Sequence, residues 1–134
     1  MTDSTTTPFA SRIDLDIPYA EAVQRVTAAL KDEGFGVLAE LDMQAILQQK
    51  QHVDIGPYVI LEVCHPPFAE QVLQTDRDAG LLLPCSVVVY ARGEGSTVTI
   101  LNPIEAIGIA QNPALTPVAE AAAQKLQRVL AALG

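Results

Sequence analysis

The clearest β-hairpin pattern in the sequence is Cys85-Ser86-Val87-Val88-Val89-Tyr90-Ala91-Arg92-Gly93-Glu94-Gly95-Ser96-Thr97-Val98-Thr99-Ile100-Leu101. Its two halves, residues 85–92 and 97–101, contain many β-branched side chains, which favour strands. The segment between them carries two glycines and suits a tight connection. Asn102-Pro103 ends the pattern, because proline has no N–H group to donate to a sheet. We therefore expect two antiparallel strands here.

Outward from this hairpin, the hydrophobic pattern predicts three further strands, two long helices and two shorter helices. The predicted strands cover residues 12–17, 35–42 and 58–63. The long helices cover residues 18–33 and 115–133, and the shorter ones 43–50 and 67–75. An antiparallel sheet of about five strands with the two long helices on one face is the simplest arrangement of this order. We expect an α+β fold with a flexible tail over residues 1–8 and a single domain over residues 9–134.

Composition narrows the classes of function. The chain has 134 residues, a net charge of −8 and only eight Lys and Arg residues, which are scattered. Nucleic acids and anionic membranes are bound by clustered basic residues, so neither is an expected partner. No signal peptide pattern is present, and no apolar run approaches the ~20 residues that span a bilayer. We expect a cytoplasmic protein with reduced cysteines.

The low charge content has a consequence for assembly. Only 18% of the residues are charged, below the roughly 25% typical of soluble domains. Some apolar surface should therefore be covered by another subunit. We expect a homodimer, and the many alanines of the last predicted helix would allow close approach of a second helix.

The two cysteines are the best candidates for a functional site. Cys64 ends the strand at 58–63 and is followed by His65 and Pro66, whereas Cys85 follows Pro84 and begins the next strand. If these two strands pair antiparallel, both thiols lie at the same rim of the sheet. If they pair parallel, the thiols lie at opposite ends.

Three interpretations of the cysteines remain open at this point. Both can be small buried strand-end residues. Alternatively, Cys64 can be a reactive thiolate beside His65 and the following helix, with Cys85 resolving an oxidised or persulfidic sulfur. Finally, Cys64, His65 and Cys85 can bind a metal, either with His52 as a fourth ligand or as a soft Cu(I) site of two thiolates. The spacing of these residues matches no zinc motif.

The chain resembles the bacterial and archaeal family called domain of unknown function 302. The resemblance runs from Ile13 to about Asn102. It is carried by Gly34-Phe35-Gly36-Val37, by Tyr58-Val59-Ile60-Leu61-Glu62-Val63-Cys64-His65-Pro66 and most specifically by Gly80-Leu81-Leu82-Leu83-Pro84-Cys85-Ser86-Val87-Val88-Val89-Tyr90. It implies a strand-helix-four strand-helix order similar to TATA-binding-protein-like folds, and often a homodimer. It implies no activity or cofactor. Family members often carry asparagine in place of His65, which weighs against a ligand or base at that residue throughout the family.

No nucleophile elbow, phosphate-binding loop or dinucleotide fingerprint occurs in the chain. The sequence therefore favours a non-enzymatic module that binds a small ligand or assembles as a homodimer. Thiol redox or sulfur chemistry and soft-metal binding at Cys64, His65 and Cys85 are the alternatives. Its ligand, and any cofactor, cannot be named from the sequence.

Overall fold

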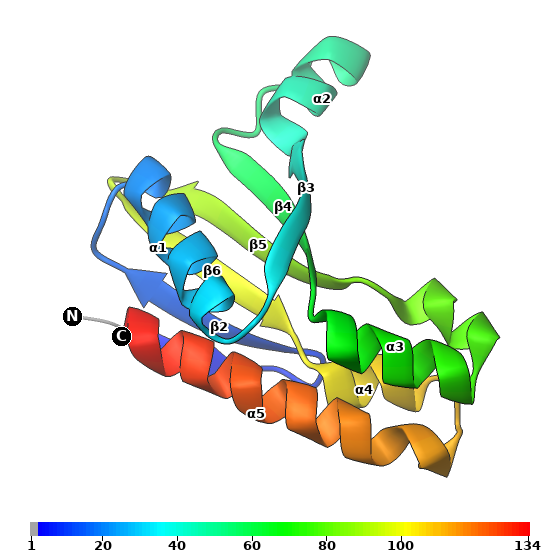
Figure 1. The fold of residues 1–134 in the computed structure, drawn as a ribbon. Coiled ribbons are helices and arrows are strands. Elements are labelled where there is room, and N and C mark those ends of the chain that lie inside the picture. The colour runs from blue at the N-terminus through cyan, green and yellow to red at the C-terminus, as the bar shows by residue number, and fades with distance from the viewer. Residues whose placement is uncertain (1–2) are drawn as a thin grey trace.

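The structure is a computed structural model that describes residues 3–134 (Figure 1). Its strands are β1 (Asp3–Thr6), β2 (Ala10–Leu15), β3 (Gly36–Asp42), β4 (Tyr58–Cys64), β5 (Cys85–Arg92) and β6 (Gly95–Leu101). Its α-helices are α1 (Tyr19–Asp32), α2 (Met43–Gln51), α3 (Pro66–Thr75), α4 (Pro103–Gly108) and α5 (Thr116–Leu133). Two short 3-10 helices, η1 (Arg77–Leu82) and η2 (Pro113–Leu115), complete the chain. The fold is of the α+β class.

The strands form one sheet in the order β1-β2-β6-β5-β4-β3, and every neighbouring pair is antiparallel. The predicted hairpin is confirmed, because β5 and β6 pair up to the turn, where Arg92 faces Gly95. Gly93 has a φ of +62° in this turn, which a residue without a side chain adopts easily. The antiparallel pairing of β4 with β5 settles the orientation that the sequence left open.

The N-terminal segment differs from expectation. Residues 3–6 were predicted to belong to a flexible tail, but they form β1 and pair with residues 11–14 of β2. β2 would otherwise be the edge of the sheet, so its free backbone groups offer a partner that local sequence does not reveal. The part of the prediction that concerns Met1 and Thr2 lies outside the described residues.

The two long helices cover one face of the sheet, as predicted (Figure 1). The buried side chains of α1 are spaced by three and four residues, which places them on a single face of the helix. They pack with the second half of α5 and with the inward side chains of β2, β4, β5 and β6. This main core includes Val26, Leu30, Leu61, Val89, Val98 and Val129.

A second, smaller core lies beyond the end of the sheet, where α3, η1, α4 and η2 surround the first half of α5. It consists of Val72, Ala79, Ile107, Leu115, Val118 and Ala119. Helix α4 was not predicted; Asn102 caps it by accepting a hydrogen bond from the N–H of Ile104 at 3.0 Å. Helix α5 thus joins the two cores, since its C-terminal half lies over the sheet and its N-terminal half lies in the second core.

Along the edge of the sheet, β3, α2 and the start of β4 form a projecting arm, which comprises residues 36–58. Figure 1 shows α2 standing away from α1 and α5. Helix α2 has no buried residue, and the arm exposes several large apolar side chains. These are Leu38, Leu41, Ile46, Val53 and Ile55.

Within the described part of the chain, no helix combines the length and apolarity needed to cross a membrane.

Candidate functional site

The two cysteines lie at the same rim of the sheet. In the antiparallel pairing of β4 with β5, Val63 faces Cys85, and Cys64 is the next residue along β4. Helix α3 begins at Pro66, directly after this rim. The structure therefore brings Cys64, His65 and Cys85 into one region, as expected for antiparallel strands.

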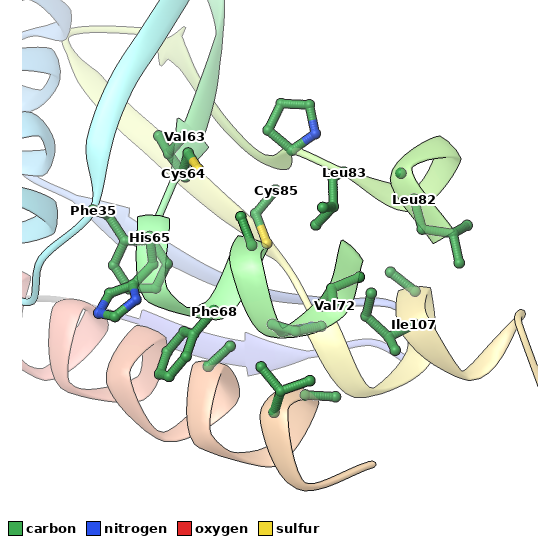
Figure 2. A pocket seen from close by; sticks show the side chains of 18 of the residues that line it. Phe35, Val63, Cys64, His65, Phe68, Val72, Leu82, Leu83, Cys85 and Ile107 are labelled. Atoms are coloured by element: carbon green, nitrogen blue, oxygen red, sulfur yellow. The ribbon is translucent and has the colours of Figure 1, made fainter. Parts of the chain in front are cut away.

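A pocket of about 290 Å3 opens at this rim (Figure 2). It lies between the end of the sheet, α3, the segment after η1, α4 and α5. Its wall combines members of both cores, including Phe35 and Val63 from the main core and Val72, Ile107 and Ala119 from the second core. The pocket thus lies between the two cores, at a place where they do not pack against each other.

Cys64 and Cys85 both line this pocket, and neither is in a disulfide. Cys85 lies on the helix-facing side of the sheet, because Val63 opposite it and Val87 two residues further along are completely buried. Burial, together with smaller effects of the neighbouring Cys64 and Glu62, raises the pKa of the Cys85 thiol to about 11. Cys85 is therefore a neutral thiol at physiological pH and a poor nucleophile.

His65 forms the wall of the pocket at the start of α3. Its ring stacks on that of Phe68, with centroids 3.9 Å apart, and meets the ring of Phe35 edge-on at 5.3 Å. Gly34 leaves the room for it, since a Cβ at that position would lie 3.0 Å from Cδ2 and Nε2 of His65. Burial and the nearby positive charge of Lys125 lower the pKa of His65, so that the ring is neutral at physiological pH.

One atom of this histidine lacks a partner. Nδ1 of His65 is buried and makes no well-formed hydrogen bond within the described residues; the only polar group recorded beside the ring is the backbone of His65 itself, which acts to raise the pKa. Buried polar atoms are nearly always satisfied in folded proteins, so an exception needs an explanation. Sequence analysis could not identify it, because neither the burial of one nitrogen nor its lack of a partner leaves a sequence pattern.

Within residues 3–134 the structure does not assemble a metal site of three or more of the predicted side chains, whereas a soft-metal site of the two thiolates alone stays a prediction. Nowhere in residues 3–134 do three His, Cys, Asp or Glu side chains come close enough together to hold a metal ion. His65 packs between phenylalanine rings rather than beside the two sulfurs. His52 caps the C-terminal end of α2 in the projecting arm, so it cannot complete the set.

The helix end next to Cys64 also lacks the features expected for thiolate chemistry. Pro66 and Pro67 occupy the first two positions of α3, and neither has an N–H group to direct at an anion. Cys85 has no cation among the groups that shift its pKa; burial, Cys64 and Glu62 all favour the neutral thiol.

The Leu81-Leu82-Leu83-Pro84 run forms a wall beside the pocket. Leu82, Leu83 and Pro84 line the pocket on one side and a broader surface hollow of about 660 Å3 on the other. The hollow lies on the opposite face of the sheet, where the hydroxyl of Ser86 donates a hydrogen bond to Glu62 at 3.1 Å. The peptide bond between Leu83 and Pro84 is cis.

Comparison with known proteins gives the family and no function. A crystal structure of an uncharacterized conserved DUF302 protein from Bacillus stearothermophilus superimposes with a TM-score of 0.88 and 32% sequence identity. That match covers 96% of this chain and 100% of the other. No curated protein is similar enough to count as a relative. The family model called domain of unknown function DUF302 matches residues 12–133, and the chain therefore belongs to the DUF302 family.

Proposed function

We propose that this protein binds a small, mainly hydrocarbon molecule in the pocket at the rim of the sheet, without transforming it. The observation that carries the proposal is the pocket itself, whose lining is almost wholly carbon and sulfur. Protein interiors are normally packed as densely as organic crystals, and a well-formed apolar pocket is the default place for a ligand.

The volume limits the size of the ligand. The pocket measures about 290 Å3, roughly twice the ~150 Å3 apolar cavity that accommodates benzene in another protein. A molecule with on the order of a dozen carbon atoms fits this space. Naphthalene is a convenient probe of that size.

A thiol-based activity is the weaker candidate. It needs a thiolate, whereas burial keeps the pKa of Cys85 at about 11. A resolving role for Cys85 would also require it to leave its packed position at the start of β5. The two thiols instead serve as polarizable wall atoms, which pack well against hydrocarbon and aromatic surfaces.

Calorimetric titration with naphthalene tests the proposal. Wild-type protein should bind one equivalent with a negative heat capacity change, the signature of apolar burial. Ala119→Leu places three more carbon atoms in the pocket and should lower the affinity at least tenfold. Ala131→Leu makes the same change at an exposed position near the end of α5 and should leave the affinity unchanged. Absence of binding to the wild-type protein, or equal affinities for the two variants, would refute the proposal.

We also propose that the protein works as a homodimer in which the projecting arms of two copies cover each other. The arm exposes five large apolar side chains, and β3 is an edge strand with free backbone groups. Exposed apolar patches and open edges normally mark association sites. Light scattering should give twice the chain mass of 14.3 kDa; a mass equal to one chain at micromolar concentration would refute the dimer.

We further propose that the protein resides in the cytoplasm, because its two free thiols suit a reducing compartment.

A further inference from the structure

The surface hollow on the outer face of the sheet is a second candidate for binding. It measures about 660 Å3, and the long helices α1 and α5 cover the other face of the sheet (Figure 1). The wall of Leu82, Leu83 and Pro84 separates it from the ligand pocket. None of the arm residues 36–58 is among the described residues that line it. The hollow is therefore distinct from the surface that forms the proposed dimer.

The hollow is apolar and is bordered by highly exposed side chains. Eight of its eleven lining residues are apolar. Leu81 and Ile109, at 90% and 72%, are the two most exposed large apolar side chains of the described residues, and Phe9 is 63% exposed. These three residues come from separate segments, before β2, in η1 and after α4. Apolar side chains gathered from distant segments around one hollow normally mark an association site.

Hydrogen bonds of the backbone hold two of these side chains in place. The carbonyl of Phe9 accepts a hydrogen bond from the N–H of Asn102 at 2.7 Å, which ties the segment before β2 to the start of α4. The N–H of Ile109 donates to the carbonyl of Ala106 at 3.3 Å. A surface whose backbone is already ordered loses less conformational entropy when a partner binds.

The charges at the hollow have one sign. Glu62 and Glu105 line it, and no Lys, Arg or His is among its described lining residues. Glu62 points to the outer face, because Leu61 and Val63 on either side of it are completely buried on the other face. Its carboxylate accepts a hydrogen bond from Ser86 at 3.1 Å, but neither glutamate forms an ion pair within residues 3–134. A positively charged group would complement this surface.

A second copy of the chain does not supply that charge. The net charge of the chain is −8. Its exposed apolar arm carries Glu40, Asp42 and Asp54 against a single Lys or Arg residue, Lys50. Like charges that face each other across an interface are unfavourable.

A small amine would supply the charge but not the cover. Leu81 is 90% exposed, so the hollow does not enclose this side chain. A molecule inside the hollow would leave most of Leu81 in water, whereas a chain that extends beyond the hollow can cover it.

We propose that the hollow is a docking site for a different protein, which binds there through a segment that carries Lys or Arg between apolar side chains. The apolar side chains of this segment contact Phe9, Leu81 and Ile109, and its cation pairs with Glu62 or Glu105. The apolar contacts supply most of the affinity, and the charge pair selects the partner. The inference is independent of the ligand proposed for the pocket.

Peptide display tests the chemistry of this partner. Random short peptides displayed on phage are selected on the wild-type protein, and the selected peptides are synthesised and measured by fluorescence anisotropy. They should be enriched in Lys or Arg flanked by apolar residues, and their affinity should fall as the salt concentration rises. Failure to select any peptide, or selection of peptides that lack a cation, would overturn the proposal. Phenethylammonium binding more tightly than every selected peptide would assign the hollow to a small amine and also overturn it.

Matched variants place the peptides in the hollow. Glu105→Lys in α4 should weaken their binding about tenfold. Glu120→Lys makes the same change at an exposed position of α5 that does not line the hollow and should leave the affinity nearly unchanged. Leu81→Ser should weaken binding about tenfold at an unchanged thermal midpoint, because the side chain is exposed. Equal affinities for the two lysine variants, or an unchanged affinity in Leu81→Ser, would overturn the docking site.

Discussion

The pocket predicts that one buried alanine can be enlarged with a gain in stability. Ala119 lies on α5, is only 4% exposed and faces the pocket. Replacement by leucine adds three carbon atoms, each of which contributes about 0.8 kcal/mol when it is transferred from water into an apolar site. Ordering the leucine side chain costs about 0.5–1 kcal/mol. We expect Ala119→Leu to raise the free energy of unfolding by about 1.5 kcal/mol.

Ala22→Leu is the matched control. Ala22 is also a helical alanine, completely buried on α1, but it packs in the main core and does not line the pocket. Three extra carbon atoms there have no free space, and overpacking of this kind typically costs about 1–3 kcal/mol. The same chemical change is therefore expected to have opposite signs at the two positions.

Urea denaturation followed by circular dichroism measures both effects. The midpoint should rise for Ala119→Leu and fall for Ala22→Leu at unchanged slope, because the slope reflects the surface exposed on unfolding. If Ala119→Leu destabilises the protein as much as Ala22→Leu does, the pocket is not open in solution. The reasoning that assigns it a ligand would then fail.

Four further predictions concern the backbone, the thiols and the arm. Gly34→Ala should lower the free energy of unfolding by about 1–2 kcal/mol more than Gly56→Ala does. Both glycines have a positive φ, but only a Cβ at position 34 would make a close contact with the ring of His65. Equal losses of stability in urea denaturation would contradict that contact. In Cys64→Ser, burial and Glu62 still raise the pKa of the remaining Cys85 thiol. Its rate of reaction with iodoacetamide should therefore keep rising at pH values above the pKa of an ordinary thiol, and a plateau near pH 8 would contradict its burial. Because the pKa of Cys85 is raised on folding, its contribution to stability is complete below about pH 9 and is lost as pH rises toward about 11, a loss that Cys85→Ala should remove. Ile55→Asp in the arm should convert the proposed dimer into a monomer in light scattering, and an unchanged dimer mass would show that another surface forms the interface.

Much of the fold could be predicted because its signals are local. The hairpin of β5 and β6 follows from β-branched strands around a glycine turn, and α5 follows from an apolar stripe at helical spacing. The common rim of Cys64 and Cys85 required only that β4 and β5 pair antiparallel. These inferences use one periodicity or one pairing at a time.

The errors have a different origin. Residues 3–6 form a strand because β2 offers them an open edge, and a threonine-rich segment without alternating apolar residues gives no sign of such a partner. Helix α4 has only six residues, too few for a periodic pattern. The imidazole of His65 packs against Phe35 and Phe68, and its closeness in sequence to Cys64 therefore does not produce the predicted three-ligand set.

The pocket depends on contacts between segments that lie still farther apart in the sequence. Its wall takes side chains from β4, α3, η1, α4 and α5, and no single segment shows that two cores meet there without closing. The spacing of Phe68 and Val72 predicts an inward helix face, and the small side chains of Ala119 and Ala122 are compatible with a cavity. Only the packed structure shows that these two faces leave space between them.

The Leu81-Leu82-Leu83-Pro84-Cys85 run, the most specific part of the family resemblance, can be explained by its position rather than by a reactive thiol. The run lies in η1 and in the segment that leads into β5. Its first four residues are all apolar, unlike the alternation of polar and apolar residues in a strand that has one face in solvent. Leu82, Leu83 and Pro84 contact two separate spaces, the pocket on one side and the surface hollow on the other, and a wall that is apolar on both sides requires apolar residues at consecutive positions. Leu81 is 90% exposed at the edge of the hollow, while Cys85 faces the pocket as a neutral thiol. The run is therefore explained as the partition that separates the pocket from the hollow on the outer face of the sheet.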